Sequence, residues 1–235
     1  MLASLPIVGF ILGCEVENRI VADMAAGDIL VLGDSVMEWN VDEDAAIADF
    51  IASELDRTVV NAGVAGAWLS IPDKVAELGP LGYDIRAQYR PRSWGWVVMD
   101  GGANDLGEEC GCGLCQATLD ELVSTDGLRG QYPDFVRSVV EDNSRVLVMG
   151  YYMPPVGAET EFTDCTNDFV ELNERLAWMA ASIDGVYFAA AADAIDPTDR
   201  TSYDPDLVHP SPQGARSIGK LLAQTILDAE RGQQH

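Results

Sequence analysis

Short apolar runs recur along the chain, and longer stretches with helical periodicity separate them. Five of the runs have the length and β-branched content of buried strands: Ile29–Leu32, Thr58–Asn61, Trp94–Asp100, Arg145–Gly150 and Val186–Ala189. Amphipathic helical spacing marks Asp42–Leu55, about Ala67–Leu78, Ser124–Glu141, Asn167–Ser182 and Pro212–Glu230. This alternation predicts βαβ units, and therefore an α/β fold with a parallel sheet covered by helices on both faces.

Residues 25–235 are predicted to form one domain, because no repeat or long linker divides them. The segment 1–24 before it begins with an apolar stretch that is too short to span a bilayer but suits an export signal. The run from Ile11 to Cys14 resembles a bacterial lipobox, which predicts a lipid anchor at Cys14. No lysine or arginine precedes Arg19, however, so an ordinary apolar segment or a misplaced start is the alternative.

The charge balance excludes several classes of partner. The chain has 39 acidic and 14 basic residues, which gives a formal net charge of −25. Nucleic acid is excluded because binding a phosphate backbone requires basic patches. Anionic membranes and polyanionic substrates would also be repelled. The composition gives no indication of the oligomeric state.

Four cysteines beyond Cys14 indicate an oxidising compartment. Three are clustered and one is distant, a pattern typical of disulfides: Cys110, Cys112, Cys115 and Cys165. A four-thiolate zinc site is an alternative, although its usual paired spacing is missing, and free thiols are a third. Together with the N-terminal segment, the cysteines favour export to the periplasm, cell surface or medium over a cytoplasmic location.

The chain has two histidines, and one of them is a candidate base. His235 is the last residue of a polar tail, whereas His209 follows Asp206 by three positions. On a turn, this spacing would bring the carboxylate to the imidazole Nδ1 and fix the tautomer. Ser35, at the end of the first apolar run, would need such a base to act as a nucleophile. Taken alone, the aspartate and histidine would merely cap the last helix.

Two glycine-containing stretches follow the second and third apolar runs. They are Asn61–Gly66 and Gly101–Asp105. Because the carboxyl ends of parallel strands meet at one edge of a sheet, both would lie near Ser35. The N–H of Gly63, the amide of Asn104 and the N–H of Ser35 would then provide three donors for a developing oxyanion. Each feature alone would be only a turn glycine or a helix cap.

The order of these blocks resembles the SGNH (GDSL-type) hydrolase superfamily. The matching blocks are Gly33-Asp34-Ser35, Gly63, Gly102-Ala103-Asn104-Asp105 and Asp206-Leu207-Val208-His209. The lipase pattern G-x-S-x-G is not met, because Met37 occupies its last position. The resemblance covers about residues 28–231 and implies a three-layer α/β/α sandwich with a five-stranded, flavodoxin-like parallel sheet. It also implies that Asp34 and Asp105 tie loops together by hydrogen bonds.

The resemblance further implies a serine esterase that needs no metal or organic cofactor. Its implied catalytic triad is Ser35, Asp206 and His209, and its implied oxyanion hole is Ser35, Gly63 and Asn104. The reaction would be hydrolysis of carboxylic esters of short to medium acyl chain through an acyl-serine.

Apolar side chains beside these blocks are candidates for an acyl pocket, although most such residues belong to cores. The candidate substrate-binding residues are Val36, Trp68, Leu106, Met153 and Val208, with Met37, Trp39 and Leu207 nearby. The substrate would be a neutral small-molecule or saccharide ester. A carbohydrate O-acetyl esterase with Trp39 and Trp68 as sugar platforms is the main alternative, and a lysophospholipase or thioesterase is another. A non-enzymatic surface protein is a third class, which the intact serine, asparagine and histidine set argues against.

Overall fold

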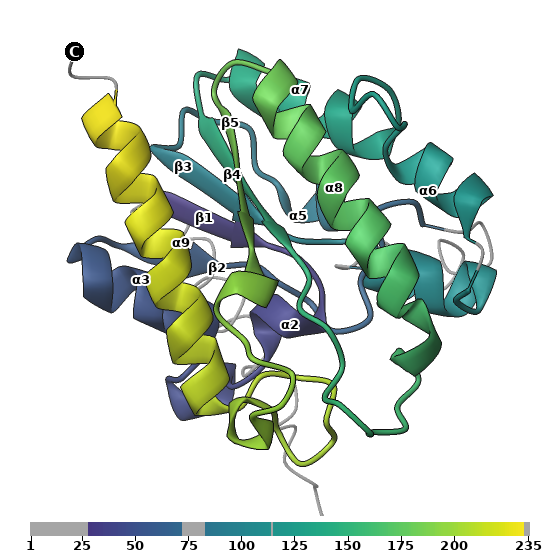
Figure 1. The fold of residues 1–235 in the computed structure, drawn as a ribbon. Helices are drawn as coiled ribbons and strands as arrows, with labels where there is room; N and C mark the ends of the chain where they lie inside the picture. Colours follow the sequence, from purple (N-terminus) through teal and green to yellow (C-terminus); the bar gives the residue numbers. More distant parts are fainter. Residues whose placement is uncertain (1–27, 72–82, 114, 233–235) are drawn as a thin grey trace, which may run out of the picture.

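The computed structural model describes residues 28–71, 83–113 and 115–232. Five parallel strands form one sheet in the order β2-β1-β3-β4-β5 (Figure 1). Their bounds are β1 Ile29–Leu32, β2 Val59–Asn61, β3 Trp96–Met99, β4 Arg145–Gly150 and β5 Val186–Ala190. The five-stranded parallel sheet predicted above is therefore confirmed.

Helices cover both faces of the sheet, which makes the predicted three layers. The helices are α2 Ser35–Glu38, α3 Ile47–Leu55, α5 Ile85–Gln88, α6 Gln116–Leu122, α7 Gln131–Glu141, α8 Thr166–Ser182 and α9 Pro212–Gly232. Helices α3 and α9 pack together on one face, and α7 and α8 lie on the other (Figure 1). The 3₁₀ turns are η1 Val41–Glu43, η3 Thr163–Cys165, η4 Ala191–Asp193 and η5 Arg200–Ser202, and a π-helix, η2 Asp105–Cys110, follows β3. None of the helices in the described ranges is long and apolar enough to cross a membrane.

The start of α3 differs from the sequence prediction. The periodicity predicted a helix from Asp42, but α3 begins at Ile47. Asp44 adopts a left-handed conformation that ends the preceding turn. The Asp49 carboxylate then accepts the Ala46 N–H at 2.9 Å, which marks the new helix start. The helical spacing of apolar residues thus extends across a turn in which the backbone is not helical.

Two other helix predictions were wrong in part. The helix predicted from Ser124 begins at Gln131, because residues 124–130 form a tight turn in which Ser124 Oγ donates to Asp126. Of the helix predicted over Ala67–Leu78, only residues 67–71 are described, and these are not helical. The short helices α5 and α6 were not predicted. By contrast, α8 and α9 lie where the periodicity placed them.

The four cysteines form two disulfides, as predicted, rather than a zinc site or free thiols. Cys110 pairs with Cys115, and Cys112 pairs with Cys165 at the start of α8. Asp168 supports this region by accepting the N–H groups of residues 113 and 115. No cluster of three or more metal-ligating side chains occurs among the described residues. The segment 1–24, the predicted anchor at Cys14 and His235 lie outside the described ranges.

The order of the strands creates a switch point beside β1. The chain passes from β1 to β2 on one side, and later enters β3 on the other side of β1. The carboxyl ends of β1 and β3 are therefore neighbours from which the connections diverge, which is where open α/β sheets bind ligands. Ser35 follows β1 and Asn104 follows β3.

Helix α9 lies unusually close to α3. Its first turn begins as predicted, since Ser211 Oγ accepts the Gly214 N–H at 3.2 Å. Further along, a Cβ atom on Gly219 would lie 2.5 Å from Phe50 Cβ and 3.0 Å from the Ile47 carbonyl oxygen. Only glycine permits this separation of the two helices.

Candidate active site

The structure brings Ser35, His209 and Asp206 together in that order. Ser35 Oγ lies 2.8 Å from His209 Nε2, although the residues are 174 positions apart in the chain. On the other side of the ring, His209 Nδ1 lies 2.6 Å from Asp206 Oδ2. The histidine side chain is only 14% exposed, and Trp39 covers one face of it in a parallel stack with ring centroids 3.7 Å apart.

A sharp turn places the Asp206 carboxylate beside the Nδ1 atom of the imidazole. Leu207 takes a left-handed conformation with φ of 61°, and Asp206 Oδ1 accepts the N–H groups of Val208 and His209. Burial alone would raise the pKa of Asp206. Hydrogen bonds from the His209 ring and from these two N–H groups outweigh burial and lower the pKa below its ordinary value. The carboxylate is thus charged and fixed toward Nδ1.

The turn that carries Ser35 is fixed on both sides. The Gln88 amide brackets Gly33, accepting its N–H at 2.8 Å and donating to its carbonyl at 2.9 Å. A Cβ at Gly33 would lie 1.9 Å from Asp100 Oδ1, so no side chain fits there. Asp34 caps α2 by accepting the Val36 N–H at 2.9 Å. Ser35 is therefore held at a defined point on the sheet edge.

Buried carboxyl groups support this turn. Asp34 Oδ2 accepts a 2.5 Å hydrogen bond from the Tyr151 hydroxyl, and the Asp34 N–H donates to Asp100 Oδ1 at 3.0 Å. Asp105 accepts the N–H groups of Leu69 and Ser70. The prediction that Asp34 and Asp105 tie loops together is confirmed. Burial raises the pKa of Asp34, and it raises the pKa of Asp105 to about 6.

Asp100 is the buried carboxyl group whose negative charge is least stabilised by hydrogen bonds. No hydrogen-bond partner within the described ranges reaches its Oδ2 atom. Burial, and then repulsion from Asp34, raise the pKa of Asp100 well above its ordinary value. The folded protein therefore holds this proton more tightly than the unfolded chain does, and the stabilisation is lost as the pH rises through the raised pKa.

Asp100→Asn is consequently expected to stabilise the protein at alkaline pH. The amide mimics the protonated carboxyl at every pH and retains an acceptor for the Asp34 N–H. We expect the variant to melt above the native protein at about pH 8, by roughly 2–4 °C for each kcal/mol gained, and the gap to close toward about pH 4. Thermal melts across this range test it, with Asp193→Asn at an exposed position as the control for loss of a charge. A constant gap, or one that widens at acid pH, would contradict the reasoning.

The predicted oxyanion donors differ in the hydrogen bonds that they already make. Asn104 Nδ2 donates to the Ala67 carbonyl at 2.8 Å, which fixes the amide and leaves its second N–H for another acceptor. The Gly63 N–H is directed at Asn61 Oδ1 at 3.0 Å, a local side-chain turn that sequence reasoning did not foresee. Asn104 lines the same pocket as Ser35.

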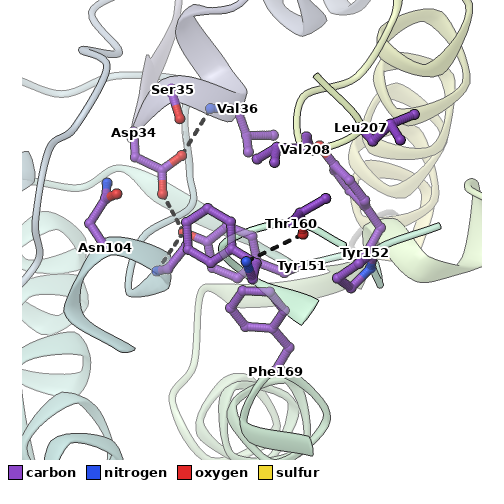
Figure 2. Close-up of a pocket in the computed structure, with 13 residues that line it drawn as sticks. Asp34, Ser35, Val36, Asn104, Tyr151, Tyr152, Thr160, Phe169, Leu207 and Val208 are labelled. Atoms are coloured by element: carbon purple, nitrogen blue, oxygen red, sulfur yellow. Dashed lines mark hydrogen bonds between the residues drawn. The ribbon is translucent and has the colours of Figure 1, made fainter. Parts of the chain in front are cut away.

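A largely apolar pocket opens beside Ser35 and Asn104 (Figure 2). Its walls come from the end of β4, the start of α8 and the turn before His209. They are lined by Tyr151, Tyr152, Pro154, Thr160, Phe162, Phe169, Leu207 and Val208, with Asp34, Val36 and Ala103 near the serine. Tyr151 and Phe169 stack with ring centroids 5.2 Å apart. His209 does not line this pocket.

Of the residues considered for an acyl pocket, Val36, Leu207 and Val208 line this pocket, whereas Met37, Trp39, Trp68, Leu106 and Met153 do not. Trp68 is 2% exposed and pairs through its backbone with Tyr83 and Ile85, so it is no platform for a sugar. Leu106 is completely buried. Met153 is absent from the lining, although its neighbours Tyr152 and Pro154 line the pocket.

Several aromatic residues that line the pocket were not predicted from the sequence. Tyr151 and Tyr152 directly follow β4, so their place at the carboxyl edge of the sheet was a usable signal. Phe162 and Phe169 had no local signal, because a long connection and a disulfide bring them to the pocket. Trp39, considered a sugar platform, has one face occupied by His209.

Known proteins resemble the chain in sequence pattern and in fold. The model of the GDSL-like Lipase/Acylhydrolase family matches residues 31–216. No curated protein sequence matches. A GDSL-like lipase from Bacteroides thetaiotaomicron has a TM-score of 0.59 and 16% identity, covering 91% of this chain and 97% of its own. A carbohydrate acetylesterase from Sinorhizobium meliloti has a TM-score of 0.55 and 17% identity (86% and 98%). The aryl esterase of M. smegmatis has a TM-score of 0.54 and 19% identity (85% and 98%).

Proposed function

The chain belongs to the GDSL-like Lipase/Acylhydrolase family, and we propose that it is a serine esterase acting on neutral carboxylic esters of short to medium acyl chain. The observation that carries the proposal is the continuous contact from Ser35 Oγ through the His209 ring to Asp206. This arrangement suits activation of a hydroxyl for nucleophilic attack.

In the proposed mechanism, His209 Nε2 takes the proton of Ser35 as Oγ attacks the ester carbonyl. The charged Asp206 stabilises the imidazolium that results. His209 then gives the proton to the departing alcohol, and an acyl-serine remains. Water, deprotonated by the same imidazole, attacks this second ester and releases the acid and the free serine.

We propose the Ser35 N–H and the second N–H of the Asn104 amide as the main donors to the oxyanion. The bond from Asn104 to the Ala67 carbonyl supports this role, because it holds the amide in place before the charge develops. The Gly63 N–H already donates to Asn61 Oδ1, so as a third donor it would have to share its hydrogen between this oxygen and the oxyanion.

Asn104→Ala is expected to lower kcat by about 10²–10³-fold with a smaller change in KM, because the amide acts mainly on the transition state. Steady-state kinetics with an aryl acetate measure the changes in kcat and in KM separately. Asn173→Ala, which removes a half-buried amide that holds the Tyr151 backbone, is the control for loss of an amide with a purely structural role. An effect confined to KM would instead assign Asn104 to binding of the ground state.

The pocket favours an ester with more than an acetyl group. Its aromatic and aliphatic walls suit an apolar acyl chain better than the methyl group of an acetate alone. The second candidate is a carbohydrate O-acetyl esterase, since a carbohydrate acetylesterase shares the fold. Comparing an aryl butyrate, an aryl acetate and acetylated xylan separates the two.

The test of the enzyme class is reaction with a fluorophosphonate probe. We expect one adduct, located on Ser35 by mass spectrometry, together with turnover of an aryl ester. Absence of both would leave the chain as a non-catalytic member of the fold.

We also propose that the protein is exported. Two disulfides support this proposal, because such bonds persist in oxidising compartments. Fractionation of the producing cells, with the disulfide state measured in each fraction, tests it.

A further inference from the structure

Phe162 forms a wall between the pocket beside Ser35 and a second cavity. It lines that pocket and also a neighbouring cavity. The second cavity is otherwise lined by Asn104, Gly107, Glu108 and Glu161. Phe162 and Asn104 are the residues common to both linings, so the phenyl ring stands where a longer pocket would continue.

The ring of Phe162 is held from several sides. A Cβ atom on Gly107 would lie 2.9 Å from Phe162 Cε1, so the ring rests directly on that glycine. Phe169 contacts the ring from α8, with centroids 5.9 Å apart. Three residues later, Cys165 is bonded to Cys112, which fixes the segment carrying the ring to the loop after η2. The wall is therefore a defined part of the pocket and not a freely rotating side chain.

The acyl portion of the ester is the portion that faces this wall. The departing alcohol must lie by His209, because its oxygen receives the proton from Nε2. His209 does not line the first pocket, whereas Ser35 and Asn104 do. Once the carbonyl carbon is on Ser35 and its oxygen faces the Asn104 amide, the acyl chain is the group left to enter the pocket.

We propose that Phe162 sets the upper limit of acyl length that this protein accepts. The inference rests on the proposed esterase function and names the residue that determines its specificity. Removing the ring would join the two cavities into one longer pocket. Because Glu108 and Glu161 line the second cavity, the longer pocket would admit neutral alkyl chains and disfavour chains ending in a carboxylate.

The test measures kcat/KM for p-nitrophenyl esters from acetate to dodecanoate with the native protein and Phe162→Ala. The native protein should lose activity sharply beyond a medium chain length. In Phe162→Ala the decline should move to longer chains, and the ratio of long-chain to acetate activity should rise by about 10-fold or more, as expected for a few methylenes newly accommodated. Phe162→Leu should give an intermediate limit.

Gly107→Ala provides the opposite test. Its new Cβ would push the phenyl ring toward the first pocket, so the chain-length limit should become shorter. Val208→Ala is the matched control, because it enlarges the first pocket at a residue that does not line the second cavity. It should leave the longest esters as poor as in the native protein.

Two negative outcomes remain distinguishable. If the native protein turns over no ester of the series and takes no fluorophosphonate, the proposed function fails. If it turns over esters, while Phe162→Ala retains its melting temperature and acetate activity but shows the native chain-length profile, only the role of Phe162 is rejected. A series with varied alcohols and a constant acetyl group should be insensitive to Phe162→Ala. Sensitivity there would instead assign the wall to the leaving group and overturn the proposal.

Discussion

Ser35→Ala is expected to reduce kcat/KM for an aryl ester by about 10⁴-fold or more while the protein stays folded. The Ser35 oxygen is the atom that would form the acyl bond, and it lies 2.8 Å from His209 Nε2. The backbone of the turn is held by Gln88 and Asp34, which the substitution leaves in place. Initial rates with purified protein measure the effect.

Two controls make the Ser35 result interpretable. The melting temperature of Ser35→Ala should match that of the native protein within a few degrees. Ser217→Ala, which removes a hydroxyl bonded within α9, should leave the kinetics unchanged. Full turnover by Ser35→Ala, or fluorophosphonate labelling that persists in it, would assign the chemistry to another residue.

Asp206→Asn is expected to lower kcat by about 10³–10⁴-fold, because it reverses the histidine tautomer. The amide oxygen can keep the N–H bonds of Val208 and His209, so the amide nitrogen then faces His209 Nδ1. Two donors cannot face each other, and Nδ1 would have to become the acceptor. Nε2 would then carry the hydrogen and could not take the Ser35 proton.

The loss in Asp206→Asn should persist across the neutral and weakly acidic range, since the low pKa of Asp206 keeps the native carboxylate charged there. Asp204→Asn, which neutralises a carboxylate on the same turn, is the matched control. Near-native kcat in Asp206→Asn would mean that the stack on Trp39 alone orients the imidazole.

The fold and the convergence of the site residues were predictable because they depend on local signals. Buried parallel strands appear as uninterrupted apolar runs, and β4 lies where its run predicted. The turn residues after β1 and β3 had to meet once the strands were parallel. Helix α9 was equally clear, since Ser211 and Pro212 mark its start.

The lining of the pocket was not predictable in the same way. Trp68 and Leu106 are apolar and close in sequence to the site residues, yet both face the core. Phe162 is far from every motif in sequence, and it reaches the pocket through the Cys112–Cys165 bond. A residue that is close to a motif in sequence lies near the same strand end. Its sequence position does not, however, predict whether its side chain points into the pocket or into the core.

The close packing of α9 on α3 has a consequence for the geometry of the candidate active site. The chain enters α3 shortly after Ser35 and enters α9 shortly after His209, so we expect the spacing of these helices to influence the distance between hydroxyl and imidazole. Gly219 is the contact that permits this spacing. A methyl group there would act as a wedge at a point that no substrate touches. Laboratory evolution confined to the rim of the pocket would therefore overlook Gly219, a position expected to influence the geometry of Ser35 and His209.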